Sequence, residues 1–209
     1  MGVTVAPIAA DQLSVHLPAL ARLRIEVFRA FPYLYDGDMA YEERYLETYA
    51  AAPNALVVGA WDGPELVGAA TAAPMEDHAA EFAAPFADRG YDLADILYCG
   101  ESVLLSRYRG QGIGNAFFDA RESHGRALER RFSAFCGVIR PEDHPARPTD
   151  YRPLDAFWRK RGYEKVAGLI AHFPWRDIGD RGESSKPMQF WLRSLMTESE
   201  AGSGPEETK

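Results

Sequence analysis

The sequence has few of the features that mark disulfide-rich, metal-binding or membrane proteins. Only 2 cysteines, Cys99 and Cys136, occur in the 209 residues, too few and too far apart for a disulfide framework or a zinc site. Both lie in apolar, strand-like segments, so we expect buried, reduced thiols. No apolar run approaches the roughly 20 residues that cross a bilayer, and the first residues lack the basic segment and apolar core of a secretion signal. We therefore expect a cytoplasmic protein without a membrane partner.

Positive charge and clustered histidine are also scarce. The formal net charge is -8, and no run of lysine and arginine offers the basic face that a nucleic-acid groove needs. The 5 histidines form no His-x-x-x-His pair and have no matching set of carboxylates. The sequence therefore predicts no nucleic-acid partner and no metal site, although it leaves room for a local basic pocket.

The remaining composition is that of a folded globular protein. Apolar residues make up 46% of the chain and aromatic residues 12%, and a chain of this length can bury a sizeable core. We expect one α/β domain over residues 1–197. Residues 76–95 break the pattern of the chain and are interpreted as an insertion that covers one side of the site, and residues 198–209 as a disordered acidic tail.

Hydrophobic periodicity predicts a chain in which strands and helices alternate. Strand patterns lie at residues 3–8, 55–61, 65–71, 96–105, 131–139, 166–173 and 186–195. Helical spacing lies at residues 13–29, 39–49, 113–128 and 154–161. Asp62, Gly63 and Pro64 favour a hairpin between the second and third strands. The prolines at 141, 145, 148 and 153 favour an irregular loop over residues 140–153.

A glycine-rich turn within residues 104–115 is the most informative stretch. It separates a strand pattern from a helical pattern and carries glycines at 110, 112 and 114 behind Arg109. Glycine removes the Cβ atoms that would hold a ligand away from the backbone, and the unpaired N–H groups of a helix N-terminus attract phosphate. A Walker loop would need a lysine after the glycines, and a dinucleotide fingerprint would need glycine at Asn115. Neither pattern is met.

The arrangement Arg109-x-x-Gly112-x-Gly114 resembles the pyrophosphate-binding turn of the GCN5-related N-acetyltransferase (GNAT) superfamily. The order of the predicted elements is also that of GNAT proteins, and residues 157–163 resemble the family's Phe-Tyr-x-x-x-Gly-Phe helix. The resemblance covers residues 3–195. It implies the GNAT-like, or acyl-CoA N-acyltransferase, fold, an α/β fold with a mixed central β-sheet flanked by helices.

This resemblance implies an N-acetyltransferase that moves the acetyl group of acetyl-CoA to a primary amine without a metal. A small-molecule amine is the expected acceptor, a protein or peptide N-terminus is the alternative, and a homodimer is one open assembly. In the family, the backbone beside the turn binds the pantetheine arm, the turn binds the pyrophosphate, and the late helix lies against the arm. The corresponding residues are Val103, Leu104, Leu105, Arg109, Gly110, Gln111, Gly112, Ile113, Gly114, Asn115, Phe157 and Trp158.

Glu101 and Tyr151 are the candidate catalytic residues. A carboxylate within an apolar strand is costly unless it has a partner or a function. Glu101 is therefore either the general base, directly or through a water, or one half of a structural ion pair or hydrogen bond. The family's acid is a tyrosine at the position of Trp158, whose indole N–H cannot protonate a thiolate. Tyr151 is the replacement that we favour, with Tyr98 and Tyr163 as alternatives.

Two loops offer candidates for acceptor recognition. Tyr33 and Tyr35 lie in an aromatic loop at residues 31–38, and Arg140 and His144 lie in the proline-rich loop. Loops on a rigid scaffold often carry recognition, but the tyrosines could equally cap the core and the charged side chains could be solvated. The departure at Trp158 also leaves open a different function, that of a catalytically degenerate module that binds acyl-CoA as a sensor.

Overall fold

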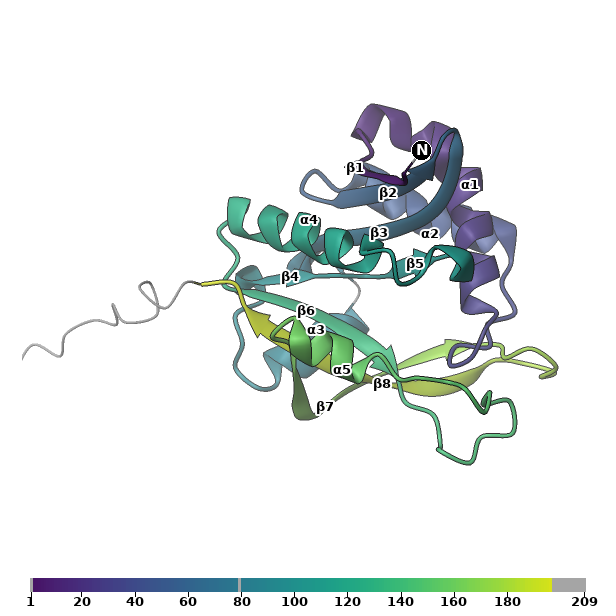
Figure 1. Cartoon of the computed structure of the whole chain (residues 1–209). Helices are drawn as coiled ribbons and strands as arrows, with labels where there is room; N and C mark the ends of the chain where they lie inside the picture. The colour runs from purple at the N-terminus through teal and green to yellow at the C-terminus, as the bar shows by residue number, and fades with distance from the viewer. Residues whose placement is uncertain (1, 79, 197–209) are drawn as a thin grey trace, which may run out of the picture.

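The structure, a computed structural model, describes residues 2–78 and 80–196. The chain begins with two helices among three strands (Figure 1), which are β1 (Thr4–Pro7), α1 (Ala10–Phe28), α2 (Met39–Ala51), β2 (Leu56–Asp62) and β3 (Glu65–Pro74). The remaining elements are α3 (Ala80–Ala87), β4 (Ile96–Tyr98), β5 (Ser102–Leu104), α4 (Ile113–Ala127), β6 (Phe132–Val138), α5 (Asp155–Lys160), β7 (Glu164–Trp175) and β8 (Ser184–Ser194). The predicted acidic tail lies outside the described residues.

The strands form one mixed sheet. Its order is β1-β2-β3-β4-β6-β8-β7, and β5 pairs with β3 beside this path. β4 and β6 run parallel, whereas the other paired strands run antiparallel. The antiparallel pairing of β2 with β3 confirms the predicted hairpin. The sheet and its flanking helices confirm the expected α/β class.

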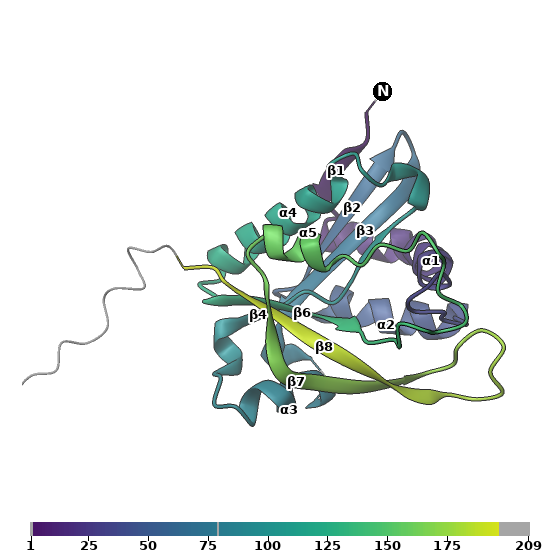
Figure 2. The same ribbon diagram turned by 60° about the horizontal axis from the view of Figure 1, so that its bottom comes forward.

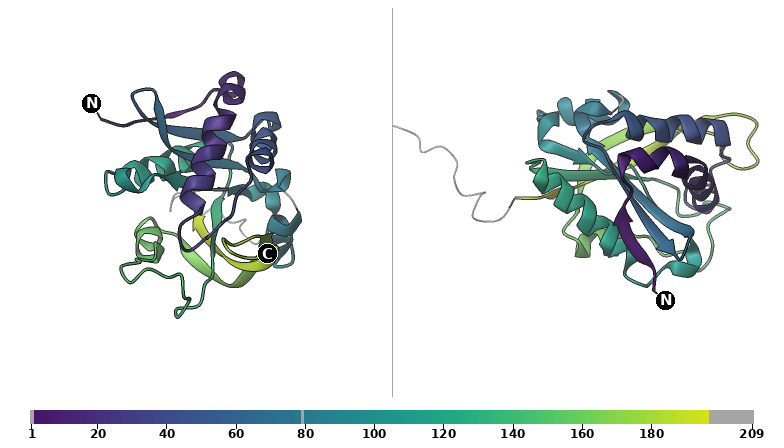
Figure 3. Two further views of the ribbon diagram at one scale, coloured as in Figure 1. Left: turned by 90° about the vertical axis from the view of Figure 1, so that its right-hand side faces the viewer. Right: turned by 90° about the horizontal axis from the view of Figure 1, so that it is seen from above.

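Helices cover both faces of the sheet. α1 and α2 lie on one face and α4 on the other (Figure 3). On the α4 side, Phe118 of α4 packs edge-on against Phe135 of β6, with ring centroids 5.8 Å apart. α3 packs against β7, where the rings of Phe82 and Phe173 stack with centroids 4.1 Å apart. Across residues 2–78 and 80–196, no helix combines the length and apolar character needed to cross a bilayer.

The predicted strand at residues 96–105 is two strands, β4 and β5, separated by residues 99–101. Packing explains the break, because a Cβ at Gly100 would lie 2.2 Å from the Tyr49 hydroxyl and 2.8 Å from Thr71 Oγ1. The chain turns through this crowded point on a residue without a side chain. Arg121 of α4 then holds the displaced backbone by donating to the Glu101 carbonyl at 3.2 Å. The break therefore sets the direction of the Glu101 side chain.

The same break opens the centre of the sheet. β4 pairs with β3 and with residues 132–134 of β6, whereas β5 pairs with β3. On its other edge β6 pairs with β8 over its whole length, residues 132–138, whereas β4 reaches only residues 132–134. β5 and β6 therefore diverge from the point where β4 holds them together, and the ribbons of the two parts of the sheet separate in Figures 1 and 2. Backbone groups along this divergence are left for another partner.

Candidate functional site

The glycine turn has the backbone geometry that an anion-binding site needs. Gly110 and Gly112 have φ angles of +78° and +86°, a left-handed conformation that residues with a Cβ avoid. Gly112 is the N-cap of α4, and no side chain caps this helix end. The first N–H groups of α4 therefore lack partners within the helix. Together with the exposed Arg109, they offer hydrogen-bond donors and positive charge to a phosphate.

β5 offers backbone groups on the edge that does not face β3. The Leu105 N–H donates to the Val67 carbonyl at 3.0 Å, so Leu105 uses its donor within the sheet. Backbone groups of successive residues in an antiparallel strand point to opposite sides. The groups of Ser102 and Leu104 therefore point toward the divergence from β6, and those of Val103 point toward β3. Of the three predicted residues, Leu104 is the best placed to bind an extended arm.

The two aromatic residues of α5 have different surroundings. A Cβ at Gly114 would lie 3.5 Å from the Phe157 ring, so Phe157 touches the first turn of α4. The ring of Trp158 packs 5.0 Å from that of Phe135, and a Cβ at Gly137 would lie 3.2 Å from it. Trp158 therefore fills the space between α5 and β6. Phe157 is the residue of this pair that contacts the glycine turn.

Glu101 lies in a buried ion-pair cluster on the α1–α2 side. Its Oε2 is 2.7 Å from Arg24 Nη1 and accepts a hydrogen bond from the Tyr45 hydroxyl at 3.1 Å. Arg24 Nε also donates to Glu42, whose side chain is fully buried. Two carboxylates thus share one guanidinium, and Glu101 Oε1 has no hydrogen-bond partner within the described residues. Because an uncompensated buried charge is unfavourable, this arrangement favours a second cation beside Glu101.

The three tyrosines considered as proton donors differ in how they are bonded. Tyr98 is buried with its hydroxyl 3.1 Å from Cys136 Sγ, and Tyr163 is buried with its hydroxyl 2.8 Å from Ser133 Oγ. Tyr151 is half-buried in the proline-rich loop. Burial raises the pKa of Tyr151 above its ordinary value, so its phenol is protonated at neutral pH.

Both cysteines are buried free thiols, as predicted.

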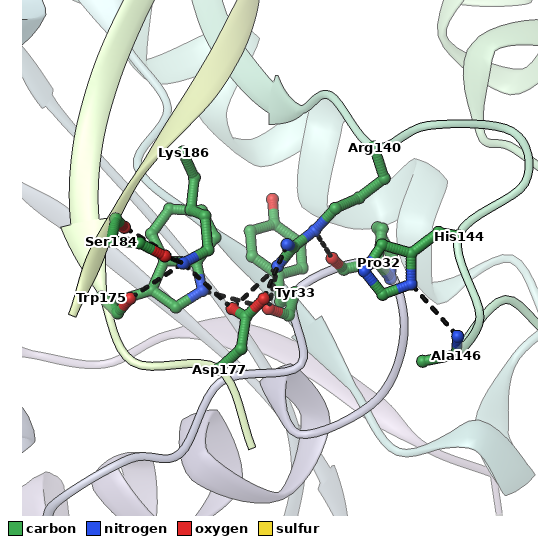
Figure 4. A network of polar contacts seen from close by, with 9 residues as sticks. All are labelled: Pro32, Tyr33, Arg140, His144, Ala146, Trp175, Asp177, Ser184 and Lys186. Atoms are coloured by element: carbon green, nitrogen blue, oxygen red, sulfur yellow. Dashed lines mark hydrogen bonds and ion pairs between the residues drawn. The ribbon is translucent and has the colours of Figure 1, made fainter. Parts of the chain in front are cut away.

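Arg140 ties together loops that are far apart in the sequence (Figure 4). Its guanidinium donates to both carboxylate oxygens of Asp177, at 2.7 and 2.9 Å, and to the carbonyls of Pro32 and Tyr33, each at 2.8 Å. Lys186 Nζ lies 3.4 Å from the same carboxylate. We refer to these five residues as the Arg140 clasp. Since Arg140 donates to groups of the protein itself, its direct effect is to hold the α1–α2 loop against the β7–β8 hairpin.

Of the other residues predicted for acceptor recognition, Tyr33 belongs to the clasp through its carbonyl, and Tyr35 and His144 have other contacts. The Tyr33 ring points away from Asp177 in Figure 4 and packs 4.6 Å from the ring of Phe28. His144 Nδ1 accepts a hydrogen bond from the Ala146 N–H at 3.1 Å. The Tyr35 ring instead fills the space beside Gly37, where a Cβ would lie 2.8 Å from it. Tyr33 therefore lies against α1. Tyr35 also reaches Glu42 of α2, because burial and a hydrogen bond to Glu42 raise the pKa of Tyr35.

Asp177→Asn is expected to lower the free energy of unfolding by about 2 kcal/mol at neutral pH, a typical contribution of hydrogen bonds to a charged group. Burial acts to raise the pKa of Asp177, but the hydrogen bonds and charge of Arg140 outweigh it and lower the pKa below its ordinary value. Such a carboxyl stabilises the fold above its unfolded pKa, and this contribution is lost as pH falls through its folded pKa. Urea unfolding at pH 7 and at about pH 2 measures the change.

The matched control for this measurement is Asp180→Asn, which removes an exposed carboxylate from the same hairpin. It should change stability by no more than about 0.5 kcal/mol. A difference between wild type and Asp177→Asn that stays the same at both pH values would mean that the carboxylate charge does not stabilise the clasp.

Sequence reasoning missed Arg24 and Glu42, although both carry a signal. Arg24 follows Leu13, Leu17 and Leu20 at helical spacing, and so occupies an apolar-face position of α1. Glu42 stands four residues before Leu46, which is buried with it on α2. A charged residue on the buried face of a helix requires a partner. The sequence contains this requirement but does not identify the partner.

No family model and no curated protein sequence matches this chain. Solved structures do. An aminoglycoside 6'-N-acetyltransferase complexed with coenzyme A is 16% identical, with a TM-score of 0.61 over 93% of this chain and 98% of that one. A ribosomal-protein-alanine N-acetyltransferase of Brucella melitensis is 14% identical, with a TM-score of 0.59 over 91% and 99% of the two chains.

The protein yncA of Salmonella typhimurium, whose structure contains its cofactor acetyl-CoA, is 10% identical, with a TM-score of 0.59 over 100% of both chains. Two other solved structures, each described as an acetyltransferase of the GNAT family, match 93% of this chain at 11% and 10% identity, with TM-scores of 0.58 and 0.56. The fold is that of the GNAT superfamily. Within the described part of the chain, no group of three or more His, Cys, Asp or Glu residues is placed to hold a metal ion.

Proposed function

We propose that this protein is an N-acetyltransferase that transfers the acetyl group of acetyl-CoA to a primary amine of a small molecule. The observation that carries this proposal is the placement of two features on opposite faces of one divided sheet. The uncapped N-terminus of α4, with its left-handed glycines, lies on one side. The buried Glu101, with an oxygen that has no hydrogen-bond partner among residues 2–78 and 80–196, lies on the other.

The donor fits the α4 side. The pyrophosphate would be bound by the N–H groups that follow Gly112 and by Arg109, since both supply donors and positive charge to an anion. The pantetheine arm would run along the free edge of β5 and pair with the backbone of Leu104. Phe157 contacts the first turn of α4 and would cover the arm. These residues bring the thioester to the point where β5 and β6 diverge.

The acceptor fits the α1–α2 side. Glu101 would accept a proton from the acceptor ammonium, directly or through a water, and leave a neutral amine. The amine nitrogen forms a bond to the acetyl carbonyl carbon, and the bond from that carbon to the CoA sulfur breaks. The departing thiolate takes a proton, for which Tyr151 is our candidate donor, and solvent then returns a proton to Tyr151. The amide nitrogen gives up its second proton to solvent, because Glu101 already holds the first. One amine and one thioester thus become one amide and one thiol.

Tyr151→Phe is expected to lower kcat by at least about ten-fold, equivalent to about 1.4 kcal/mol in the barrier. The variant keeps the ring that packs 4.7 Å from Phe31 and removes only the hydroxyl. Initial rates of CoA release at saturating acetyl-CoA measure the change. Tyr41→Phe is the control, because Tyr41 is 54% exposed on α2 and should retain full activity. A Tyr151→Phe enzyme with wild-type kcat would exclude Tyr151 as the acid.

The direct test of the proposed function is acetyl transfer itself. Purified protein is incubated with acetyl-CoA and a broad panel of primary amines, and CoA release and the acetylated products are measured. A thermal-shift series with CoA and acetyl-CoA runs in parallel, since a ligand at 100 times its Kd adds about 2.7 kcal/mol to stability. Turnover of an amine supports the proposal. Stabilisation by ATP or NAD but not by CoA would contradict it.

A second function is favoured by one observation, the position of Trp158. Its ring is packed into the core between α5 and β6 at the position of the family's acid. A module that binds acyl-CoA as a sensor would need the turn but not the acid. Binding of acetyl-CoA without turnover of any amine in the panel would support that function over acetyl transfer.

A further inference from the structure

Two chains of aromatic contacts lead from the Glu101 cluster to strand β7. In the first, the Arg24 guanidinium lies 5.2 Å from the Phe28 ring, Phe28 lies 4.6 Å from Tyr33, and Tyr33 lies 6.2 Å from Trp175. Each distance joins ring centroids or the guanidinium carbon to a centroid. This first arm follows α1 and its loop down to the end of β7. The Arg140 clasp holds its middle member, Tyr33, through the main chain.

The second arm leaves the same guanidinium in the other direction. Arg24 lies 4.4 Å from the Tyr45 ring, and Tyr45 lies 5.7 Å from Tyr49. His78 follows at 6.0 Å from Tyr49, then Phe82 at 5.8 Å from His78. Phe82 finally stacks on Phe173 of β7 with centroids 4.1 Å apart. This arm runs through α2 and α3.

The two arms end at neighbouring positions on β7. Phe173 and Trp175 are alternate residues of β7, so their side chains lie on the same face of the strand. Both arms thus begin at Arg24 and end side by side on β7. Tyr98 of β4 and Cys136 of β6 form the floor within the rim, since Tyr98 lies 4.8 Å from both His78 and Phe82 and its hydroxyl contacts Cys136. We call these two arms together the aromatic rim.

The exposure of the rim differs from that of its floor. Tyr98 and Cys136 are buried, and so is Tyr49 in the second arm, whereas Tyr33, Phe173 and Trp175 keep part of their surface exposed. Aromatic faces that remain partly exposed are available to bind a flat apolar group or a cation. The rim is polar at a few points: Glu101 Oε1 and His78 Nε2 are both buried without a hydrogen-bond partner in the described residues.

The charges around Arg24 also determine which ligand the rim can bind. Arg24 neutralises one carboxylate, but both Glu42 and Glu101 are buried beside it. Within the described residues neither carboxylate has another ion-pair partner. Burial lowers the pKa of His78 to about 4, so this ring is neutral at physiological pH and adds no positive charge. The rim therefore combines apolar ring faces with one uncompensated negative charge at the point where its arms meet.

We propose that the aromatic rim receives the acceptor, and that the acceptor is an amine joined by a short alkyl chain to an aromatic ring. Its ammonium group lies at Glu101 and its ring lies against Phe173 and Trp175. This inference rests on the proposed acetyl transfer and names the class of its substrate. An aminoglycoside fits less well, because its hydroxyl and ammonium groups would lose water against aromatic faces that offer few hydrogen bonds.

The test compares three acceptors on the wild-type protein: 2-phenylethylamine, propylamine, which lacks the ring, and the aminoglycoside kanamycin. We expect kcat/KM for 2-phenylethylamine to exceed that of propylamine by about ten-fold or more, since burying a ring favours binding by at least that factor. Kanamycin should be the poorest of the three. Equal or higher kcat/KM for propylamine or kanamycin would overturn the aromatic acceptor and leave acetyl transfer intact.

A matched pair of β7 variants locates the preference. Phe173→Leu removes a ring of the rim. His172→Leu changes the preceding residue, which is exposed on the opposite face of the strand. Phe173→Leu should reduce the ratio of the two kcat/KM values to about three-fold or less without changing KM for acetyl-CoA. His172→Leu should keep the ratio. A ratio that survives in Phe173→Leu would overturn the assigned position.

Binding to the wild-type protein provides a readout that needs neither turnover nor a variant. 2-Phenylethylamine should raise the melting temperature in the presence of CoA, and propylamine at the same concentration should not. 2-Phenylethylamine is titrated up to about 100 times a Kd of 1 mM, the upper end of ordinary KM values. No shift in melting temperature up to that concentration would overturn the inference. Failure of the proposed function would be seen separately, as a protein that does not bind acetyl-CoA or acetylates no amine.

Discussion

Gly112→Val is expected to weaken binding of CoA and acetyl-CoA at least about 100-fold, equivalent to about 2.7 kcal/mol. Gly112 is the N-cap of α4 and precedes the N–H groups proposed to bind the pyrophosphate. The substitution places methyl groups where the phosphates approach the backbone and disfavours the left-handed conformation that directs these groups. Isothermal titration with CoA measures the loss.

The control must carry the same backbone strain elsewhere. Gly112 has φ of +86° and Gly63, in the β2–β3 hairpin, has φ of +58°, and a Cβ at either would meet no atom within 4 Å. A non-glycine residue in the left-handed conformation lowers the free energy of unfolding by about 1–2 kcal/mol. Gly63→Val should therefore lose about as much stability as Gly112→Val, but it should bind CoA normally. If both variants bind CoA with the wild-type Kd, the turn is not the pyrophosphate site.

The parts of this site that could be predicted are those whose conformation depends on residues close together in the sequence. The turn and the helix after it follow from glycine spacing and from the hydrophobic period of 3.6 residues. The hairpin at Asp62, Gly63 and Pro64 is local in the same sense. For these elements the backbone conformation is determined within a few residues, so the sequence-based prediction and the structure agree.

The break within residues 96–105 could not be predicted in the same way. Periodicity indicates one continuous apolar strand there, and the interruption arises from distant groups. Tyr49 of α2 and Thr71 of β3 crowd Gly100, and Arg121 of α4 holds the Glu101 carbonyl. A strand pattern indicates which residues are apolar. It does not indicate which side chains from other elements pack against them.

The polar clusters were beyond sequence reasoning for the same reason. Arg140 was a candidate for direct acceptor binding, yet it donates to Asp177 and to two carbonyls of the α1–α2 loop. Its partners lie 37 to 108 positions away in the sequence. Composition shows that a charge exists, but the topology of the fold decides whether it meets a ligand or another residue. We therefore propose that Arg140 acts on the acceptor by positioning Tyr33.

The chemistry at Glu101 provides the most direct test of catalysis. Glu101→Gln is expected to lower kcat by roughly 10²–10⁴-fold, the usual contribution of a general base. Glutamine keeps the shape of the side chain and can still accept the hydrogen bond from Tyr45, but it cannot take a proton from the acceptor. The Kd for acetyl-CoA should not change, because the lost interaction belongs to the transition state. Initial rates at saturating acetyl-CoA and titration of acetyl-CoA measure the two quantities.

Glu42→Gln is the matched control, because it removes the other carboxylate that Arg24 binds. Both variants take one negative charge from the same guanidinium, so both should lose stability by similar amounts. Glu42 lies on α2 and is fully buried, whereas Glu101 lies at the break between β4 and β5, where the sheet opens. A general base at Glu101 therefore predicts a large loss of kcat in Glu101→Gln and no more than a few-fold loss in Glu42→Gln. Equal losses in the two variants would assign Glu101 to the ion-pair cluster alone, because a purely structural role does not distinguish the two partners of Arg24.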